Sequence, residues 1–116
     1  MAICLGATVQ RFISGSEVFF AIVNPTWDLC CDHGQIGMAV LSQSPSSQVF
    51  FVDRQPHIIE KLRKKLRSIA IDDGRYGIRC ADILKMPLPE SPCNVIIAGV
   101  GTNLIIEFLS RLLCPT

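Results

Sequence analysis

From Thr26 onward, short apolar runs rich in β-branched and aromatic residues alternate with segments of helical periodicity. This alternation is typical of βαβ units, because neighbouring parallel strands need a crossover connection that usually contains a helix. The chain has 116 residues, which is room for one domain of this kind and not for two. The sequence therefore predicts an α/β fold with a mostly parallel sheet, with residues 26–116 as the domain and residues 1–25 as a lead-in segment.

The pattern places four strands and three helices after the lead-in segment. The strands are expected at residues 27–31, 49–52, around 77–80, and at 94–98. The clearest helix begins at Pro56, where proline is favoured, and its apolar residues recur at helical spacing: Ile58, Ile59, Leu62, Leu66 and Ile69. A shorter helix is expected through Met38–Leu41 and a last one from Leu104 to Leu112, ended by Pro115. The lead-in segment fits neither period well, and a short helix is expected in it.

Charge and hydropathy exclude several classes of protein. Eleven Lys and Arg against ten Asp and Glu give a net charge of +1, so no overall field favours a nucleic acid, an anionic membrane or an acidic partner. Apolar residues make up 49% of the chain and charged residues 18%, which argues against disorder. The longest apolar runs are far shorter than a bilayer requires, and no membrane association is expected.

The six cysteines have neither the secretory signal nor the loop-rich pattern of a disulfide scaffold. Arg11 interrupts the apolar start of the chain, and no basic region precedes it, so the cytoplasm is the expected location. Because no CxxC spacing occurs, a structural zinc site is not expected and no metal is predicted. The thiols are expected to be reduced, buried and structural.

Polar residues follow each expected strand, at the edge of the sheet where open parallel sheets bind ligands. Asp32, His33 and Gly34 follow the first strand, Asp53 the second, Asp82 the third, and residues 99–103 the fourth. A carboxylate in the position of Asp53 can accept two hydrogen bonds from a ribose diol. Asp82 and the backbone of Ile83 lie where an adenine amino group could be recognised. A nucleotide-containing ligand is therefore expected at this edge.

The one segment that is similar to a dinucleotide fingerprint is GVGTNL, at residues 99–104. It has Leu104 at the third glycine position, and no acidic residue follows at the required distance. NAD and FAD are therefore not expected.

Four motifs together resemble the class I S-adenosylmethionine-dependent methyltransferases in order and spacing: DLCCDHGQIG at 28–37, VFFVDRQPHI at 49–58, CADIL at 80–84 and NVIIAGVGTNLIIEFL at 94–109. Within that superfamily, the sequences after the first and fourth strands resemble the bacterial tRNA adenine-N1 methyltransferases that modify the D-arm. The resemblance covers residues 26–109 and implies a Rossmann-like fold, S-adenosyl-L-methionine as cofactor and tRNA as substrate.

The resemblance also implies roles for individual residues. Those expected around the methionine part of the cofactor are Asp28, Cys30, Asp32, His33 and Gly34. Asp53 is expected to hold the ribose, and Asp82 with Ile83 the adenine. Residues 98–102 are expected to face the target base. The cofactor-binding set is completed by Cys31, Arg54, Ala98 and Gly99. Cys30 and Asp32 stand where the usual loop has glycine, and Thr102 stands where a second glycine is common.

The reaction needs positioning more than acid or base catalysis, because a sulfonium is already an activated leaving group. Methylated adenine is cationic, so Asp32 is the first candidate to stabilise the developing charge; an Asx-type cap on the next helix is the alternative. His33 is either its orienting partner or a spacer. Asn103 can donate to the base or satisfy the first turn of the last helix. His57 is expected on the surface or in a cap.

The helix after the second strand carries five basic residues: Lys61, Arg63, Lys64, Lys65 and Arg67. They could form a phosphate-binding patch or simply the solvated face of a surface helix. Aromatic residues do not alternate with them, so a stacking platform for single strands is not indicated.

Members of the resembled family continue beyond the fourth βα unit into a fifth strand, an antiparallel pair and a helical domain thought to engage tRNA. The fold is therefore expected to be truncated, with the fourth strand as an open edge that invites self-association. Two other functions stay open on this basis. One is a cofactor-binding remnant without catalysis, and the other is an interaction module that uses the open edge.

Overall fold

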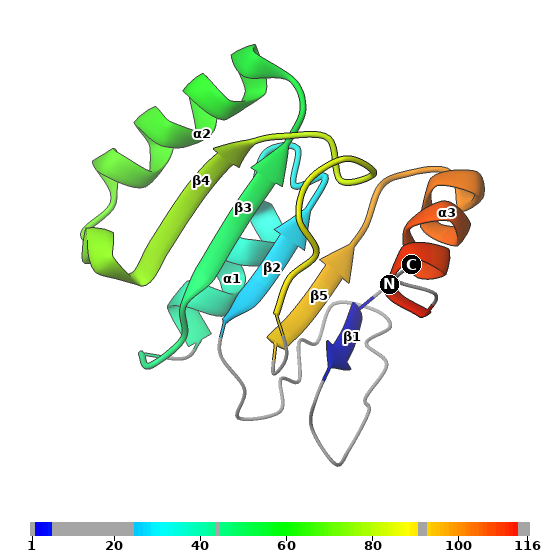
Figure 1. Cartoon of the computed structure of the whole chain (residues 1–116). Coiled ribbons are helices and arrows are strands. Elements are labelled where there is room, and N and C mark those ends of the chain that lie inside the picture. Colours follow the sequence, from blue (N-terminus) through cyan, green and yellow to red (C-terminus); the bar gives the residue numbers. More distant parts are fainter. Residues whose placement is uncertain (1, 6–24, 44, 91–92, 114–116) are drawn as a thin grey trace.

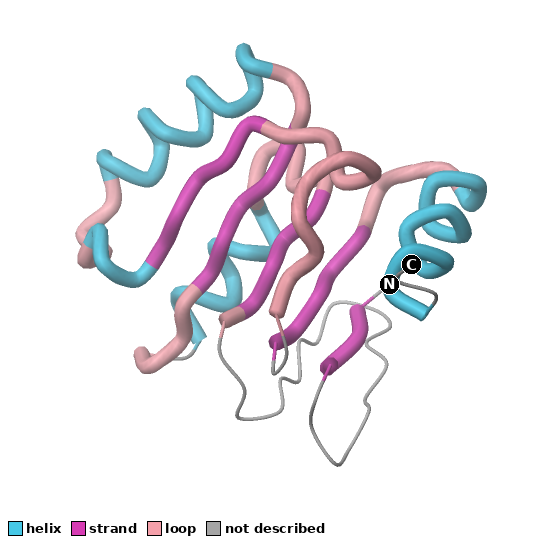
Figure 2. Tube along the Cα trace, viewed as in Figure 1, coloured by secondary structure: helices cyan, strands magenta, loops and turns pink. Residues whose placement is uncertain are grey.

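The computed structural model describes residues 2–5, 25–43, 45–90 and 93–113. In these ranges it contains five strands, three α-helices and one short 3₁₀ helix (Figures 1 and 2). The strands are β1 (Ala2–Leu5), β2 (Thr26–Leu29), β3 (Val49–Asp53), β4 (Tyr76–Cys80) and β5 (Cys93–Ile97). The helices are α1 (Gln35–Gln43), α2 (Pro56–Ser68), η1 (Asp73–Arg75) and α3 (Thr102–Leu113). Each element expected after Thr26 is present, with ends that differ by no more than three residues.

The strands form one sheet in the order β1-β5-β2-β3-β4. Strands β5, β2, β3 and β4 are parallel, so their carboxyl ends meet at one edge of the sheet (Figure 1). The parallel α/β fold predicted from the alternating pattern is confirmed.

Strand β1 corrects the expectation that the fourth parallel strand is an open edge. It pairs antiparallel with β5, with Ala2 opposite Ile96 and Leu5 opposite Cys93. The outer edge of the fourth parallel strand is therefore covered by the chain's own first residues. Within the lead-in segment, residues 2–5 form this strand. The short helix expected in that segment is not tested, because residues 6–24 lie outside the described residues. Pairing satisfies the backbone N–H and C=O groups that an open β5 edge would expose.

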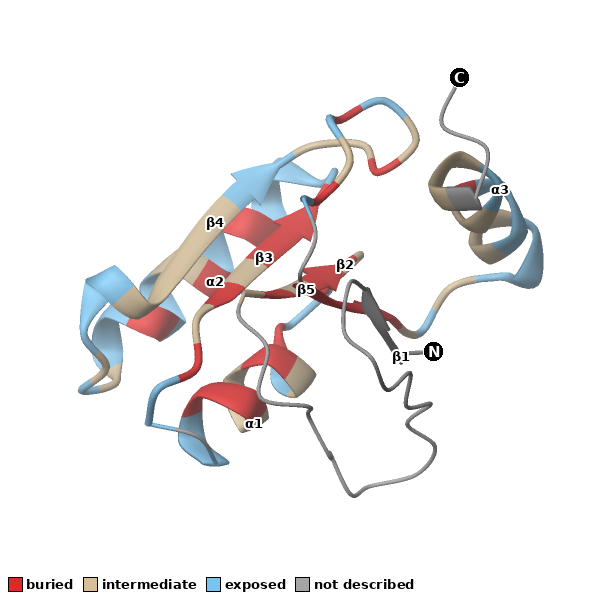
Figure 3. Ribbon diagram, turned by 60° about the horizontal axis from the view of Figure 1, so that its bottom comes forward, coloured by how far each residue is buried: buried red, intermediate tan, exposed pale blue. Residues whose placement is uncertain are grey.

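The core lies on both faces of the sheet. On one face, α1 and α2 pack against the sheet through a cluster that contains Val40, Leu62, Leu66 and Phe51. On the other face, α3 contributes Phe108 to a second cluster formed mainly by the opposite side chains of β2, β3 and β5. Figure 3 shows the buried residues concentrated in the central strands and on the sheet-facing sides of α1 and α2. No helix in the described part is long and apolar enough to cross a membrane.

Two arginines hold loops by donating to backbone carbonyls. Arg75 donates to Leu41 O at 2.9 Å and to Ser47 O at 3.2 Å, and so fixes the end of α1 and the loop that follows. Arg111, near the end of α3, donates to Ile83 O and, at 2.9 Å, to Met86 O. Ile83 and Met86 both lie in the segment between β4 and β5, so the two contacts of Arg111 hold this segment against α3.

Four cysteines are free thiols: Cys30, Cys31, Cys80 and Cys93. Cys31 and Cys93 are buried and Cys30 is half-buried, as expected, but Cys80 is exposed. It ends β4, which is the edge strand of the parallel part of the sheet, and its thiol lies 3.6 Å from Arg54 O.

Candidate functional site

The turn after β2 has a backbone that L-residues rarely adopt. Cys30, Asp32 and Gly34 all have positive φ, at 56°, 52° and 72°. For Cys30 and Asp32 this conformation costs about 1–2 kcal/mol each. Gly34 also has no room for a side chain, since a Cβ would lie 2.6 Å from Leu62 Cδ1. Cys30 and Asp32 stand where the usual glycine-rich first loop has glycine, so the backbone has the positive φ of such a loop without two of its glycines.

Asp53, the last residue of β3, fixes this turn from the neighbouring strand. Its Oδ2 accepts from Asp32 N at 3.1 Å and its Oδ1 accepts from Gln55 N at 3.0 Å. The side chain is only 9% exposed. Each carboxylate oxygen keeps a further lone pair, so Asp53 can hold the turn and still accept from a ligand.

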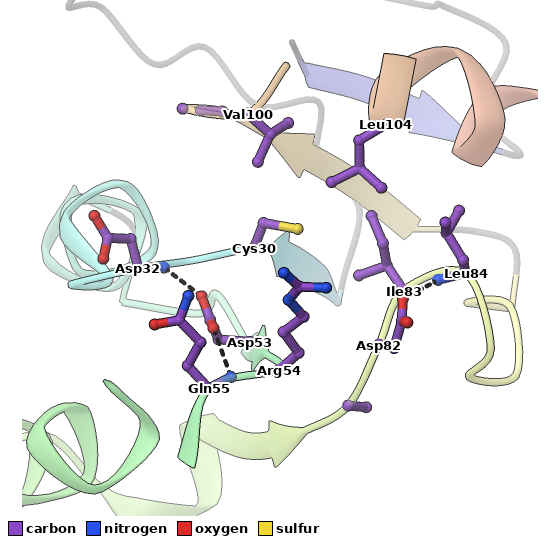
Figure 4. A pocket seen from close by; sticks show the side chains of 13 residues that line it. Cys30, Asp32, Asp53, Arg54, Gln55, Asp82, Ile83, Leu84, Val100 and Leu104 are labelled. Carbon is purple, nitrogen blue, oxygen red and sulfur yellow. Dashed lines mark hydrogen bonds between the residues drawn. The ribbon is translucent and has the colours of Figure 1, made fainter. Parts of the chain in front are cut away.

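A cavity of about 360 Å³ opens beside Asp53 at the carboxyl ends of the strands (Figure 4). This volume is within the range of small-molecule sites. One wall is formed by Cys30 and Asp53, and the opposite wall by Asp82, Ile83 and Leu84. The full lining is Cys30, Asp32, Asp53, Arg54, Gln55, Ala81, Asp82, Ile83, Leu84, Ala98, Gly99, Val100 and Leu104.

A second cavity of about 270 Å³ lies on the other side of the turn. It shares Asp32, Ala98 and Gly99 with the first, so the two cavities adjoin. Its lining is Asp28, Cys31, Asp32, His33, Gln35, Ile36, Ala98 and Gly99. Together the two cavities form a site of two parts around residues 30–34.

Asp28 is the most perturbed carboxyl group of the site. It is 3% exposed, and its Oδ2 accepts from Gly37 N at 3.0 Å. Burial raises the pKa of Asp28 to about 7; the hydrogen bond from Gly37 opposes the shift and the nearby Asp53 adds to it. The group is therefore poised to gain or lose a proton near neutral pH, or to ionise beside a cation.

The two thiols of the turn are not nucleophiles at neutral pH. Burial, with the negative charges of Asp53 and Asp82, raises the pKa of Cys30 to about 11. Burial and the charges of Asp28 and Asp53 also raise the pKa of Cys31. Because the thiolate is the reactive form, both side chains act as small apolar groups in the lining.

The structure brings most of the predicted site residues together. Those that line one or both cavities are Asp28, Cys30, Cys31, Asp32, His33, Asp53, Arg54, Asp82, Ile83, Ala98 and Gly99. Gly34 lines neither cavity. It belongs to the turn after β2, where its N–H donates to Cys31 O at 2.8 Å. Asn103, the second residue of α3, and His57, the second residue of α2, are exposed and line neither cavity.

Asp32 and His33 lie side by side at the mouth of the second cavity. His33 Nε2 is 3.8 Å from Asp32 Oδ1, which is beyond hydrogen-bond length, and the side chains are 58% and 70% exposed. In the described residues the Asp32 carboxylate makes no hydrogen bond to α1, so the capping alternative has no contact to support it. In Figure 4 this carboxylate points away from Asp53.

Val100, in the loop expected to face the target base, lines the larger cavity. Sequence reasoning missed six lining residues: Gln35, Ile36, Gln55, Ala81, Leu84 and Leu104. Most of them stand within one or two positions of a predicted site residue. Their closeness in sequence to a strand end could therefore have identified them as lining residues. Leu104 lies inside the predicted last helix, where its helical spacing indicates a residue packed in the core and not one that lines a cavity.

A family model described as a methyltransferase domain matches residues 18–114. No curated protein matches the chain. Among solved structures, the chain is similar to the apo form of SibL, an S-adenosylmethionine-dependent methyltransferase, with a TM-score of 0.65 and 22% identity. The match covers 78% of this chain and 27% of SibL, so the chain spans about a quarter of that protein's length. The likeness confirms the Rossmann-like methyltransferase fold that the sequence motifs predict.

Proposed function

The chain belongs to the methyltransferase-domain family, and on that premise we propose that it binds S-adenosyl-L-methionine in the two-part site and methylates N1 of an adenine in tRNA. Membership of the family supports methyl transfer in general, and the resemblance of residues 28–37 and 94–109 to the adenine-N1 enzymes supports the tRNA substrate.

The observation that carries the proposal is the nearly buried carboxylate of Asp53 in the wall of the larger cavity. A ribose diol offers two donors, and Asp53 retains acceptor capacity beyond its two backbone bonds. Across the cavity, Asp82 uses Oδ1 to accept from Leu84 N at 2.9 Å, which leaves its other oxygen for an amino group. Ile83 and Leu104 offer apolar surface to a flat ring. The residues present therefore fit the nucleoside part of the cofactor.

The smaller cavity fits the amino-acid part of the cofactor. Asp28 and Asp32 are its acidic groups, and either can hold an ammonium group. A cation beside Asp28 would favour ionisation of a carboxyl group that burial keeps partly protonated.

When bound, S-adenosyl-L-methionine supplies a methyl group on a positively charged sulfur. The chain's own residues have two tasks at the target base. Ala98 and Gly99, common to both cavities, are small enough to let a flat ring approach. Asp32, with its exposed carboxylate, stabilises the positive charge that forms on the methylated adenine. The lone pair of adenine N1 is available at neutral pH, so no general base is required.

Calorimetric titration of S-adenosylhomocysteine, with circular dichroism of the same sample, tests the cofactor site. We expect saturable binding to a folded chain. A folded chain without binding would refute the cofactor assignment. Transfer of labelled methyl groups to unmodified tRNA, followed by nucleoside analysis for 1-methyladenosine, tests the substrate. Binding without transfer to tRNA would leave the chain as a cofactor-binding domain and would refute the proposed reaction.

A further inference from the structure

The positive charge of this protein is concentrated on one helix. Helix α2 carries five of the eleven Lys and Arg residues and one of the ten acidic residues, Glu60. The rest of the chain has six basic and nine acidic residues, a net charge of −3. The net charge of +1 is therefore the sum of a basic helix α2 and an acidic remainder of the chain. Four of the acidic residues line the two-part site: Asp28, Asp32, Asp53 and Asp82.

The basic side chains of α2 are on its outer side. The apolar residues Ile58, Ile59, Leu62 and Leu66 are buried against the sheet. The exposed basic residues are Lys61, Lys64, Lys65 and Arg67, which we call the α2 basic face. None of them makes an ion pair with a residue in the described part of the chain; the ion pair on this helix joins Arg63 to Glu60 at 3.8 Å.

Helix stability explains only part of the α2 basic face. Lys65 and Arg67 lie in the last turn, where a cation interacts favourably with the helix dipole. Lys61 and Lys64 lie in the middle of the helix and gain nothing from the dipole. Lys61 and Lys65 are also spaced i, i+4, and a like-charge pair at this spacing destabilises a helix by about 0.2–0.5 kcal/mol. Lys61 therefore opposes the stability of the helix that carries it. Lys64 is spaced i, i+4 from Glu60, which is a favourable spacing, but the carboxylate of Glu60 pairs with Arg63.

The α2 basic face begins next to the site. Helix α2 starts directly after Gln55, which lines the larger cavity, and Figure 1 shows its first turn at the carboxyl ends of the strands. At 1.5 Å per residue, Lys61 and Lys64 lie about 8 and 12 Å along the helix axis from Pro56. A polyanion held there can extend to the site without placing its phosphates against the site's carboxylates.

The chemistry of the face selects a nucleic acid over a membrane. A membrane-bound helix must insert an apolar face, and the apolar face of α2 is already buried in the core. The exposed groups are three lysine ammonium groups and the guanidinium of Arg67, and α2 carries no Phe, Tyr or Trp, which suits contacts to phosphates more than stacking on bases. We infer that the α2 basic face binds the phosphate backbone of the RNA substrate, with Lys61 and Lys64 as its central contacts. This inference rests on the proposed action on tRNA.

The test is binding of fluorescently labelled tRNA by anisotropy, measured from about 50 to 200 mM salt. The variants are the doubly substituted Lys61→Gln/Lys64→Gln and, as a matched control, Lys85→Gln, which changes an exposed lysine outside α2. We expect the double variant to bind tRNA about tenfold more weakly, with a salt slope smaller by about 1.5, since each phosphate contact contributes about 0.7–0.9. The control should bind like the wild type.

Three further readouts separate the possible failures. Lys61→Arg/Lys64→Arg should retain the affinity for tRNA, and S-adenosylhomocysteine should bind all variants equally. If the wild type binds tRNA and the double Gln variant binds it equally well, the inference is overturned while the proposed function stands. If the wild type binds no tRNA at low salt, both the inference and the tRNA substrate are overturned. Binding to acidic phospholipid vesicles in its place would assign the face to a membrane and would equally overturn the inference.

Discussion

Replacing Asp28 by asparagine should remove a pH dependence from the folding stability. Burial raises the pKa of Asp28 from 3.8 to about 7 in the folded chain, so the folded state binds a proton more readily than the unfolded state between these values. The stability that this group contributes is therefore fully present below about pH 4 and is lost as the pH rises to about 7. Asparagine keeps the shape and can still accept the hydrogen bond from Gly37, but it cannot ionise.

The magnitude follows from linkage. Each pH unit in this window changes the free energy of unfolding by at most about 1.4 kcal/mol per proton. Across the window the wild type should lose about 3–4 kcal/mol relative to Asp28→Asn. The difference between the two proteins isolates Asp28, because the other carboxyl groups titrate in both.

Urea unfolding followed by circular dichroism, at half-unit steps from about pH 4 to 8, measures this difference. We expect the variant to gain stability relative to the wild type as the pH rises and the difference to level off above about pH 7. A difference that stays constant across the range would show that Asp28 is ionised throughout and would refute the assignment of burial as the dominant cause.

Three further predictions concern the site and its supports. Cys30→Gly should be more stable than Cys30→Ala by about 1 kcal/mol in thermal or urea unfolding, because only glycine adopts positive φ without cost. Asp53→Ala should weaken S-adenosylhomocysteine binding at least tenfold in calorimetry, which corresponds to about 1.4 kcal/mol. Arg111→Gln should weaken the same binding about threefold or more, because it releases the loop that carries Ile83. Arg75→Gln, which removes a similar pair of carbonyl contacts far from the site, should lower stability by about 1–3 kcal/mol and leave the affinity unchanged.

Each of these predictions has a result that contradicts it. Equal stability of the two Cys30 variants would mean that the turn relaxes out of the left-handed conformation. Unchanged affinity of Asp53→Ala would remove Asp53 from the ligand contacts and limit it to holding the turn. Equal loss of affinity in Arg111→Gln and Arg75→Gln would mean that affinity follows global stability and not the position of the loop.

The elements with strong local patterns could be predicted from the sequence. Helix α2 combines a proline at its start with four apolar residues at helical spacing, and β3 is a continuous apolar run that ends in Asp53. Because the strand ends of a parallel sheet converge, correct strands were enough to place Asp32, Asp53 and Asp82 in one site.

Other features depend on contacts that no local pattern reports. Strand β1 has four residues and takes its place only by pairing with a distant strand. The positive φ of Cys30 is imposed by the turn against the preference of the residue. The clamp that Arg111 makes on Ile83 joins positions 28 residues apart, and an arginine in a last helical turn predicts no such contact.

Strand β1 also constrains the order in which the domain folds. Its partners in β5 are 88 to 94 positions away along the chain, from Leu5–Cys93 to Ala2–Ile96. Closing so long a loop has a large entropic cost before any pairing offsets it. The β2–β3–β4 core, whose contacts are closer in sequence, can form earlier. We therefore expect β1 to join last, after residues 93–97 have been synthesised, so that the outer edge of β5 is open to other chains only during folding.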